Sequence, residues 1–200
     1  MGGALVREGP VTLPDAVCDF VIEGTVLYAI AEAGDEVLTL SMETGAELGR
    51  IVVPHAAGLD AFALQGIEKA GDKIYILGSH PANGGDHNTH RIGVFDLRSG
   101  QTETVYSFES SSFPDLVGLQ WIEGDLWTFD YSSRHLMEVH AENGEFELVD
   151  GFEILDEDLP NAETASGGLR GFFFSRDHLI LSSISGRDGE SSLIHILDRL

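Results

Sequence analysis

Short apolar stretches alternate with turn residues along the whole chain. Many of these stretches alternate apolar and polar positions or are short runs of β-branched and aromatic residues, as in residues 73–77, and this pattern is typical of β-strands. No stretch has the periodicity of an amphipathic helix of ten or more residues; residues 59–64 and 156–165 have room for a helical turn or two. The pattern therefore predicts an all-β protein.

One layout of strands recurs four times. An apolar strand, a turn with Gly or Asp and a second strand come first, a third strand follows, and in the first three copies a Gly-containing turn leads to a fourth strand. The first two strands occupy residues 20–28, 67–75, 121–127 and 173–180. The third strands occupy residues 36–41, 91–96, 135–140 and 192–198. The turns before the fourth strands are residues 43–45, 98–100 and 142–144.

The spacing of the copies predicts a closed ring. Leu27, Ile74, Leu126 and Leu179 hold the same place in each copy and lie 47, 52 and 53 residues apart. Four-stranded units that repeat every ~40–50 residues are typical of the blades of a β-propeller. The fourth copy ends after its third strand, so we expect residues 4–8 and 11–13 to complete it and close a ring of four blades. The alternative is a ring of five blades, with one blade hidden in residues 154–166.

The strand–turn–strand units resemble a known superfamily of propellers. The resemblance is carried by Gln65-Gly66, by residues 71–75 and 64–80, and by units that end in Thr44-Gly45 or Ser99-Gly100. The chain is similar to the superfamily that includes the NHL, gluconolactonase-like, phytase-like and glutaminyl-cyclotransferase-like proteins. This resemblance implies a propeller over all 200 residues. It implies no activity, because the active-site residues of the glutaminyl-cyclotransferase-like proteins have no match here position by position.

The charge balance narrows the choice of partners. The 200 residues include 34 acidic and 11 basic ones, for a net charge of −23, and 42% are hydrophobic. We expect one folded domain over residues 1–200, with no affinity for nucleic acid or anionic membranes. The basic residues are nine Arg and only two Lys, which fits either a halophilic protein or a lineage that prefers Arg. No secretory signal is visible at the start, which predicts a cytoplasmic protein, although a mature secreted chain would look the same.

The loop predicted for residues 78–90 is the first candidate site. It holds three of the eight histidines, His80, His87 and His90, beside Asp86. Imidazole and carboxylate ligands suit zinc, so His87, His90 and Asp86 are candidate metal ligands. His80 and Asp86 are candidate catalytic acid–base groups. The alternative is a solvated loop without a special role.

A second candidate lies in the acidic stretch of residues 153–163. Asp156 and Asp158 offer the oxygen ligands that calcium prefers. The spacing is not that of an EF-hand loop, and a run of acids is more often a solvated surface.

The predicted loops that enter the blades provide a third set. Six residues there are expected to face the central channel: Asp15, Asp19, Gln65, Asp115, Gln120 and Arg170. Gln65, Gln120, Asp15 and Asp115 would contact a ligand. Arg170 would hold an anionic substrate group, with an ion pair that braces adjacent blades as the alternative. Trp121, Trp127, Tyr28 and Tyr75 are expected to pack between blades.

Three functions fit this sequence. The first is a metal-assisted hydrolase or lyase that acts on a small polar substrate at the channel mouth, with calcium or zinc as Lewis acid. The second is a non-catalytic binding module for a peptide, sugar or protein. The third is a structural component of a larger assembly.

Overall fold

The structure is a computed structural model of the 200-residue chain. The structure describes residues 17–31, 36–52, 63–81, 88–109, 116–130, 133–153, 169–174, 178–185 and 191–198. All regular elements in these ranges are β-strands, as the alternating pattern predicts. Within the described residues, no helix is long and apolar enough to span a bilayer.

The strands form four antiparallel units that follow one another along the chain. Unit 1 contains β1 (Val17–Glu23), β2 (Val26–Ala31), β3 (Glu36–Ser41) and β4 (Glu47–Val52). Unit 2 contains β5 (Ala63–Ala70), β6 (Lys73–Pro81), β7 (Asn88–Asp96) and β8 (Gln101–Glu109). Unit 3 contains β9 (Leu116–Ile122), β10 (Asp125–Asp130), β11 (His135–Glu142) and β12 (Glu145–Glu153). Unit 4 contains β13 (Leu169–Phe174), β14 (His178–Ser185) and β15 (Ser191–Asp198).

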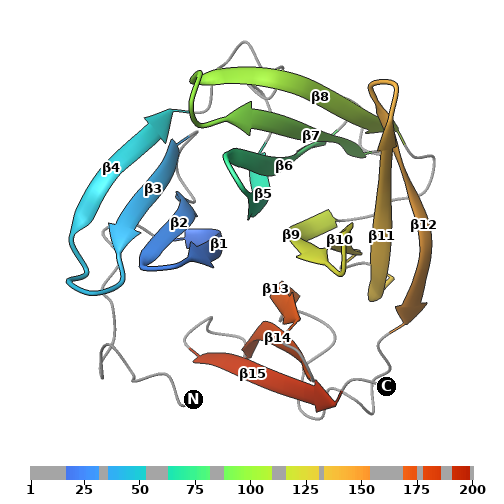
Figure 1. Cartoon of the computed structure of the whole chain (residues 1–200). Coiled ribbons are helices and arrows are strands. Elements are labelled where there is room, and N and C mark those ends of the chain that lie inside the picture. Colours follow the sequence, from blue (N-terminus) through green and yellow to red (C-terminus); the bar gives the residue numbers. More distant parts are fainter. Residues whose placement is uncertain are drawn as a thin grey trace.

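The four units surround a common axis. The first strand of each unit, β1, β5, β9 or β13, lies innermost, and the later strands lie progressively further out (Figure 1). The outer strands of units 2 and 3 are also joined, because β8 and β12 pair in parallel at Ser107 and Glu145. Units 2 and 3 therefore form one eight-stranded sheet.

The hairpin turns carry the residues that tight turns require. Between β11 and β12, Asn143 and Gly144 both have positive φ, 53° and 83°. Two successive positive φ values match the right-handed twist of the flanking strands, which favours Asn-Gly in such a hairpin. The predicted third strands and turns are confirmed, with β3 at the residues expected.

The hairpin between β6 and β7 differs from the expectation. The region 78–90 was predicted as a loop, but antiparallel pairing continues from Gly78 and Arg91 through Ser79 and His90 to Pro81 and Asn88. The polar composition of this region hid the strands. As a result, His80 and His90 lie in strands.

The core lies in the seams between units. Between units 1 and 2 it is aliphatic: Ile30 and Val37 pack against Ile67, Ile74 and Ile76. Between units 2 and 3, a second cluster joins Leu77 and Ile92 to Leu116, Leu126 and Val139, with aromatic rings against its edge. The strands of unit 2 thus bury both faces, which explains why Leu77, beside Ile76 on β6, is also fully buried.

Candidate functional site

All four inner strands have a β-bulge at the same place. The register shifts at Val17/Asp19 in β1, at Leu64/Gly66 in β5 and at Leu169/Gly171 in β13. In β9 the shift lies opposite Thr128. A bulge bends the strand and redirects its backbone groups, and bulges are frequent next to functional sites.

Asp19 lies in β1, directly at this register shift. The equivalent residues of the other units are glycines, Gly66, Gly118 and Gly171. The Asp19 carboxylate accepts the backbone N–H of Ile67 on β5 at 2.8 Å. It also accepts the backbone N–H groups of Phe20 and Leu119. One carboxylate therefore connects the inner strands of units 1, 2 and 3.

The environment of Asp19 changes its protonation. Burial is the main cause that raises its pKa to about 7, and the nearby Glu68 carboxylate raises it further. The hydrogen bonds from backbone N–H groups act in the opposite direction, because they stabilise the charged form. Burial outweighs them, so Asp19 exchanges its proton close to neutral pH.

Glu68 makes a similar connection between units 2 and 3. Its Oε2 accepts the backbone N–H of Trp121 on β9 at 2.9 Å, and its Oε1 accepts the N–H of Lys69 at 2.6 Å. The side chain is buried, and burial raises its pKa. Because both oxygens hold backbone groups, Glu68 fixes the position of Trp121 relative to unit 2.

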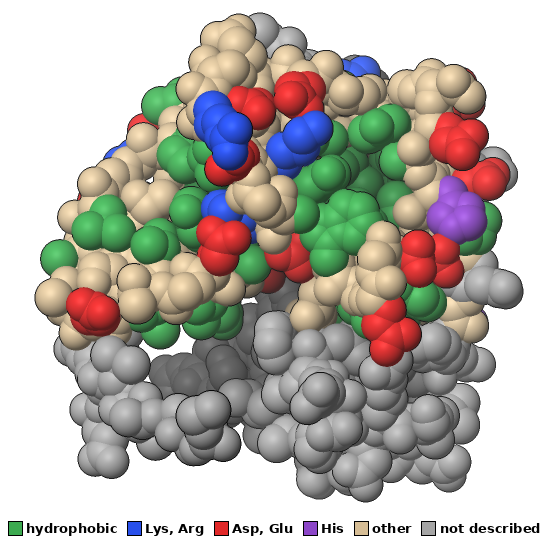
Figure 2. Space-filling view, viewed as in Figure 1, with side chains coloured by type: hydrophobic (Ala, Val, Ile, Leu, Met, Phe, Trp, Pro, Cys, Tyr) green, Lys and Arg blue, Asp and Glu red, His purple; other side chains and the backbone are tan. Residues whose placement is uncertain are grey.

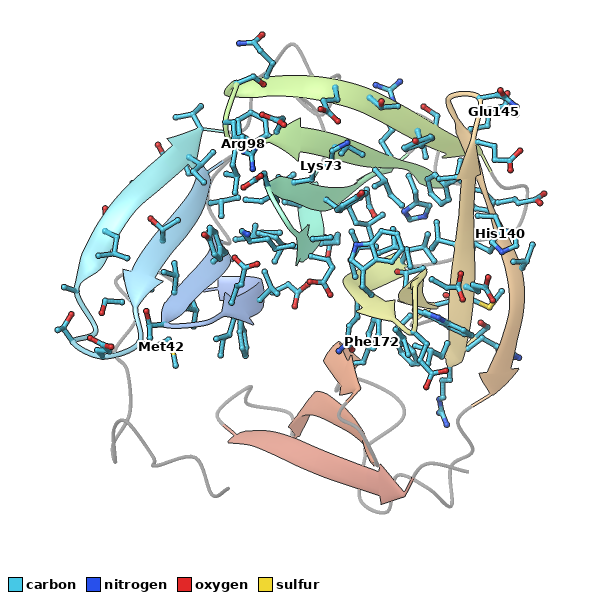
Figure 3. All side chains as sticks on the ribbon, in the orientation of Figure 1. Met42, Lys73, Arg98, His140, Glu145 and Phe172 are labelled. Carbon is cyan, nitrogen blue, oxygen red and sulfur yellow. The ribbon has the colours of Figure 1, made fainter. Side chains whose placement is uncertain are left out.

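Glycines let the inner strands of neighbouring units meet. A Cβ on Gly66 would lie 2.7 Å from the carbonyl carbon of Gly118, closer than real Cβ atoms come. A Cβ on Gly118 would lie 3.0 Å from the ring of Phe172, at the inner end of unit 4 (Figure 3). The Thr128 hydroxyl donates to the Gly118 carbonyl at 2.9 Å. The described part of the axis is therefore closely packed.

A groove opens between units 2 and 3, away from the axis. It has a volume of about 350 Å³ and is visible in Figure 2 as a hollow with an apolar lining. Its lining comes from β6 to β8 on one side and from β9 to β11 on the other: Tyr75, Ile92, Tyr106, Trp121, Gly124, Asp125, Leu126, Val139, His140, Ala141 and Glu142.

Aromatic rings form the walls of this groove. Tyr75 and Trp121 meet edge to face, with ring centroids 5.4 Å apart. Burial raises the pKa of the Tyr75 hydroxyl, with a smaller contribution from neighbouring Tyr106. The indole N–H of Trp121 is buried and has no hydrogen-bond acceptor among the residues that the structure describes, an exception that native interiors seldom show.

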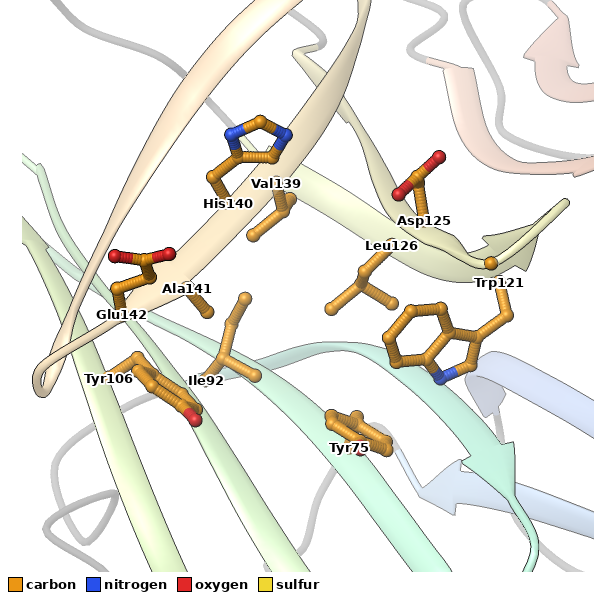
Figure 4. A pocket seen from close by; sticks show the side chains of 11 residues that line it. Tyr75, Ile92, Tyr106, Trp121, Asp125, Leu126, Val139, His140, Ala141 and Glu142 are labelled. Carbon is orange, nitrogen blue, oxygen red and sulfur yellow. The ribbon is translucent and has the colours of Figure 1, made fainter.

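The edge of the groove carries charged side chains. Leu126, Val139 and Ala141 point into the space between the units, whereas Asp125, His140 and Glu142 point outward at its edge (Figure 4). On the unit 2 side, Lys73 beside Tyr75 forms an ion pair with Glu103. An apolar interior with charged groups at its margin can hold an apolar group and orient what is attached to it.

The predicted site residues are only partly covered by the structure. Asp15, Asp86, His87, Asp115, Asp156 and Asp158 lie outside the described residues. His80 is in β6 and Arg170 is in β13, but their side chains are not among those described.

The covered candidates do not meet in one place. His90 is fully buried against Phe108, and its Nδ1 lies 2.7 Å from the Ser79 hydroxyl. Gln65 and Gln120 are partly buried on β5 and β9. No group of three His, Cys, Asp or Glu side chains in the described ranges could hold a metal. Zinc or calcium binding thus stays a prediction, as does the cytoplasmic location.

Sequence reasoning missed Glu68 and the groove. Glu68 had a signal that went unused, because it is a carboxylate in an inner strand next to the apolar Ile67. Tyr75 and Trp121 do pack between units, as expected, but the open space beside them follows from how two units meet.

No known protein family and no curated protein matches this sequence. The structure is similar to the GH43 BlXynB protein from Bacillus licheniformis, with a TM-score of 0.64 and 12% identity over 88% of this chain. It is also similar to the Nup133 β-propeller domain of Vanderwaltozyma polyspora (TM-score 0.46, 10% identity, 92% of this chain) and to the computationally designed Ika4 protein (0.45, 12%, 98%). The chain spans 37% of the B. licheniformis protein, 56% of the Nup133 domain and 99% of Ika4. The likeness to the B. licheniformis protein supports the β-propeller fold and carries no activity over to this chain.

Proposed function

We propose that units 1 to 4 are the four blades of one propeller over residues 1–200 and that the N-terminal residues complete unit 4. This proposal is supported by the repeat in the sequence and by three units of four strands followed by one of three in the described ranges. In such a ring, seams between blades are the places where a partner reaches both sheets at once.

We propose further that the protein is a non-catalytic binding module whose binding site is the groove between units 2 and 3. The observation that carries this proposal is the groove of about 350 Å³ with Tyr75, Tyr106 and Trp121 in its lining. Concave sites of this size that combine apolar and aromatic walls with polar groups at fixed positions are typical of ligand binding.

The axis offers less to a substrate than the groove does. Both oxygens of Glu68 accept backbone N–H groups, and Asp19 accepts three. Carboxylates engaged in this way hold strands together, and they would have to release those bonds before they could act on a substrate. The hydrogen-bond pattern therefore favours a structural role for these two acids.

A hydrolase or lyase that acts at the axis is the second candidate. The observation in its favour is Asp19, whose pKa of about 7 suits a general acid or base. Hydrolysis of a panel of nitrophenyl glycosides and esters, with zinc or calcium added, tests this candidate. Turnover by the wild type that Asp19→Asn abolishes would favour it; equal rates in the two proteins would leave Asp19 without a catalytic role.

Selection from a random peptide library displayed on phage tests the binding-module proposal. The targets are the wild type and Ala141→Trp, in which an indole fills the groove. We expect peptides that are enriched on the wild type and not on the variant. A second variant, Glu43→Gln, changes only an exposed carboxylate in the turn after β3, far from the groove, and should enrich the same peptides as the wild type. Identical enrichment on all three proteins would contradict the proposal.

A further inference from the structure

The interior of the groove is suited to one large apolar side chain. Ile92, Leu126, Val139 and Ala141 face the space, and the rings of Tyr75 and Trp121 limit it. Aromatic side chains gain most from such a site because they bury ~150–250 Å² each and pack against other rings at their edges. In interfaces, residues of this type in a closed pocket carry most of the binding energy.

Two carboxylates at the edge of the groove have no partner within the described residues. Asp125 begins β10 and Glu142 ends β11, and both side chains are exposed. Neighbouring carboxylates have partners of their own, since Glu103 forms an ion pair with Lys73 and Glu138 forms a hydrogen bond with His140. A cationic group at this edge would therefore find unpaired acceptors.

The net charge of the whole protein also favours a basic partner. With a net charge of −23, the protein attracts basic partners over distances of about a Debye length and repels acidic ones. Charge complementarity of this kind raises association rates and excludes the wrong partners.

In another seam of the protein, a basic side chain already contacts both an aromatic ring and a carboxylate. In the seam between units 1 and 2, the Lys69 ammonium lies 5.5 Å from the centre of the Tyr28 ring and pairs with Glu23. Tyr28 and Tyr75 are equivalent in the repeat, and so are Lys69 and Trp121. At the first seam, a basic side chain of the protein itself thus combines an aromatic contact with a carboxylate.

We propose that the groove between units 2 and 3 binds a basic peptide segment, with one large aromatic side chain inserted between Tyr75 and Leu126 and flanking Lys or Arg residues on Asp125 and Glu142. This inference rests on the proposed binding function and specifies its partner. The aromatic side chain supplies affinity through burial, and the basic residues supply orientation and selectivity.

Fluorescence anisotropy with three labelled peptides tests the inference. The probes are Lys-Arg-Trp-Arg-Lys, the same peptide with Ala for Trp, and Glu-Asp-Trp-Asp-Glu. We expect the first to bind best. Loss of the aromatic side chain should weaken binding at least about tenfold, because burial of such a side chain contributes ~1.5–3 kcal/mol. The acidic peptide should bind still more weakly.

Variants of the protein separate the two contributions. Asp125→Asn with Glu142→Gln should weaken binding of the basic Trp peptide by about fivefold, since exposed ion pairs contribute up to ~1 kcal/mol each. Glu43→Gln, an exposed carboxylate in the turn after β3 of unit 1, is the control and should leave affinity unchanged. Ala141→Trp should abolish the difference between the Trp and Ala peptides.

The outcomes distinguish this inference from the proposed function. If the acidic Trp peptide binds as well as the basic one and Ala141→Trp weakens both, the groove binds ligands but the basic partner is wrong. If the basic peptides bind equally with Trp or Ala and ignore Ala141→Trp, the attraction is nonspecific and both proposals fail. If none of the peptides binds the wild type, the inference is likewise overturned, and the phage selection then decides the proposed function alone.

Discussion

The seam between units 1 and 2 and the seam between units 2 and 3 use the same repeat positions in different ways. In the first seam, β-branched Ile and Val side chains pack closely, and Lys69 lies over Tyr28 and pairs with Glu23. In the second, Trp121 replaces the lysine and meets Tyr75, and a groove of about 350 Å³ remains beside the two rings.

The difference shows how a repeat protein can acquire a binding site without a change of fold. Both seams keep the same inner connection, in which a carboxylate of one unit accepts a backbone N–H of the next: Asp19 to Ile67 and Glu68 to Trp121. The inner strands hold the units at a fixed distance. Side chains further out then decide whether the space between two units is filled or left open.

Among the changes to the two seams, the protonation of Asp19 in the first seam should change the free energy of unfolding most. Its pKa is about 7 in the folded protein and near 3.8 when unfolded, so the folded protein keeps the proton up to higher pH. The free energy of unfolding should therefore fall as pH rises from 4 to 7, by up to about 4 kcal/mol. In Asp19→Asn this part of the pH dependence should vanish.

Urea denaturation at pH 4.5 and 7.5 measures this effect. Glu43→Gln is the control, because it removes one exposed carboxylate and leaves the axis intact. The repulsion that comes with a net charge of −23 acts on all three proteins and cancels in their differences. A pH dependence in Asp19→Asn equal to that of the wild type would show that the carboxyl is not buried as described.

Gly66→Ala should disrupt the second seam at the axis. The new Cβ would lie 2.7 Å from the Gly118 carbonyl carbon. Because this is a contact with backbone, it can be relieved only if a whole strand shifts. We expect a loss of about 3 kcal/mol in the free energy of unfolding. At Gly49, a Cβ would be 3.6 Å from the Thr39 hydroxyl, an ordinary contact. Gly49→Ala should therefore be nearly neutral, and equal losses in the two variants would contradict the close approach.

Glu68 tests whether the inner connection also supports the groove. Glu68→Ala leaves the N–H groups of Trp121 and Lys69 without their acceptor, which should cost about 2 kcal/mol in unfolding experiments. Glu68→Gln keeps one carbonyl oxygen and should cost about half as much. Affinity for the basic Trp peptide should decrease in the same order. Unchanged affinity in Glu68→Ala would mean that Trp121 is held in place by packing alone.

Lys69→Met should have the smallest effect and is confined to the first seam. The substitution removes the ammonium from Tyr28 and Glu23 but keeps an apolar chain of similar length. We expect a loss of about 1 kcal/mol in stability and no change in peptide affinity. A marked change in affinity would show that the two seams are coupled.

Much of the fold can be predicted from the sequence because its signals are local. Alternation of side chains marks each strand, and Gly45, Gly100 and Gly144 mark the turns between third and fourth strands, all with positive φ in the structure. Residues 78–90 were wrongly predicted as a loop because their side chains are polar. The antiparallel pairing of β6 and β7 continues through this region by backbone hydrogen bonds, which need no apolar side chains.

The site was less predictable. Asp19 was expected to face the channel, and the structure shows that its carboxylate accepts the backbone N–H of Ile67 on the neighbouring inner strand. Its role in connecting three units depends on bulges that the sequence does not mark. The groove depends on the distance between Tyr75 and Trp121, which lie in different units, and no local pattern reports that distance. His87, Asp86 and the acids of residues 154–168 lie outside the described ranges, so their roles stay predictions.

The indole N–H signals of the protein report directly on whether the groove beside Trp121 binds a partner. The chain has two tryptophans, Trp121 in the groove and Trp127 on β10 outside its lining, and Trp127→Phe assigns the two signals. In ¹⁵N NMR spectra, saturating Lys-Arg-Trp-Arg-Lys should shift the Trp121 signal and leave the Trp127 signal in place. A shift of Trp127 alone, or of neither signal at a concentration where anisotropy shows binding, would contradict the claim.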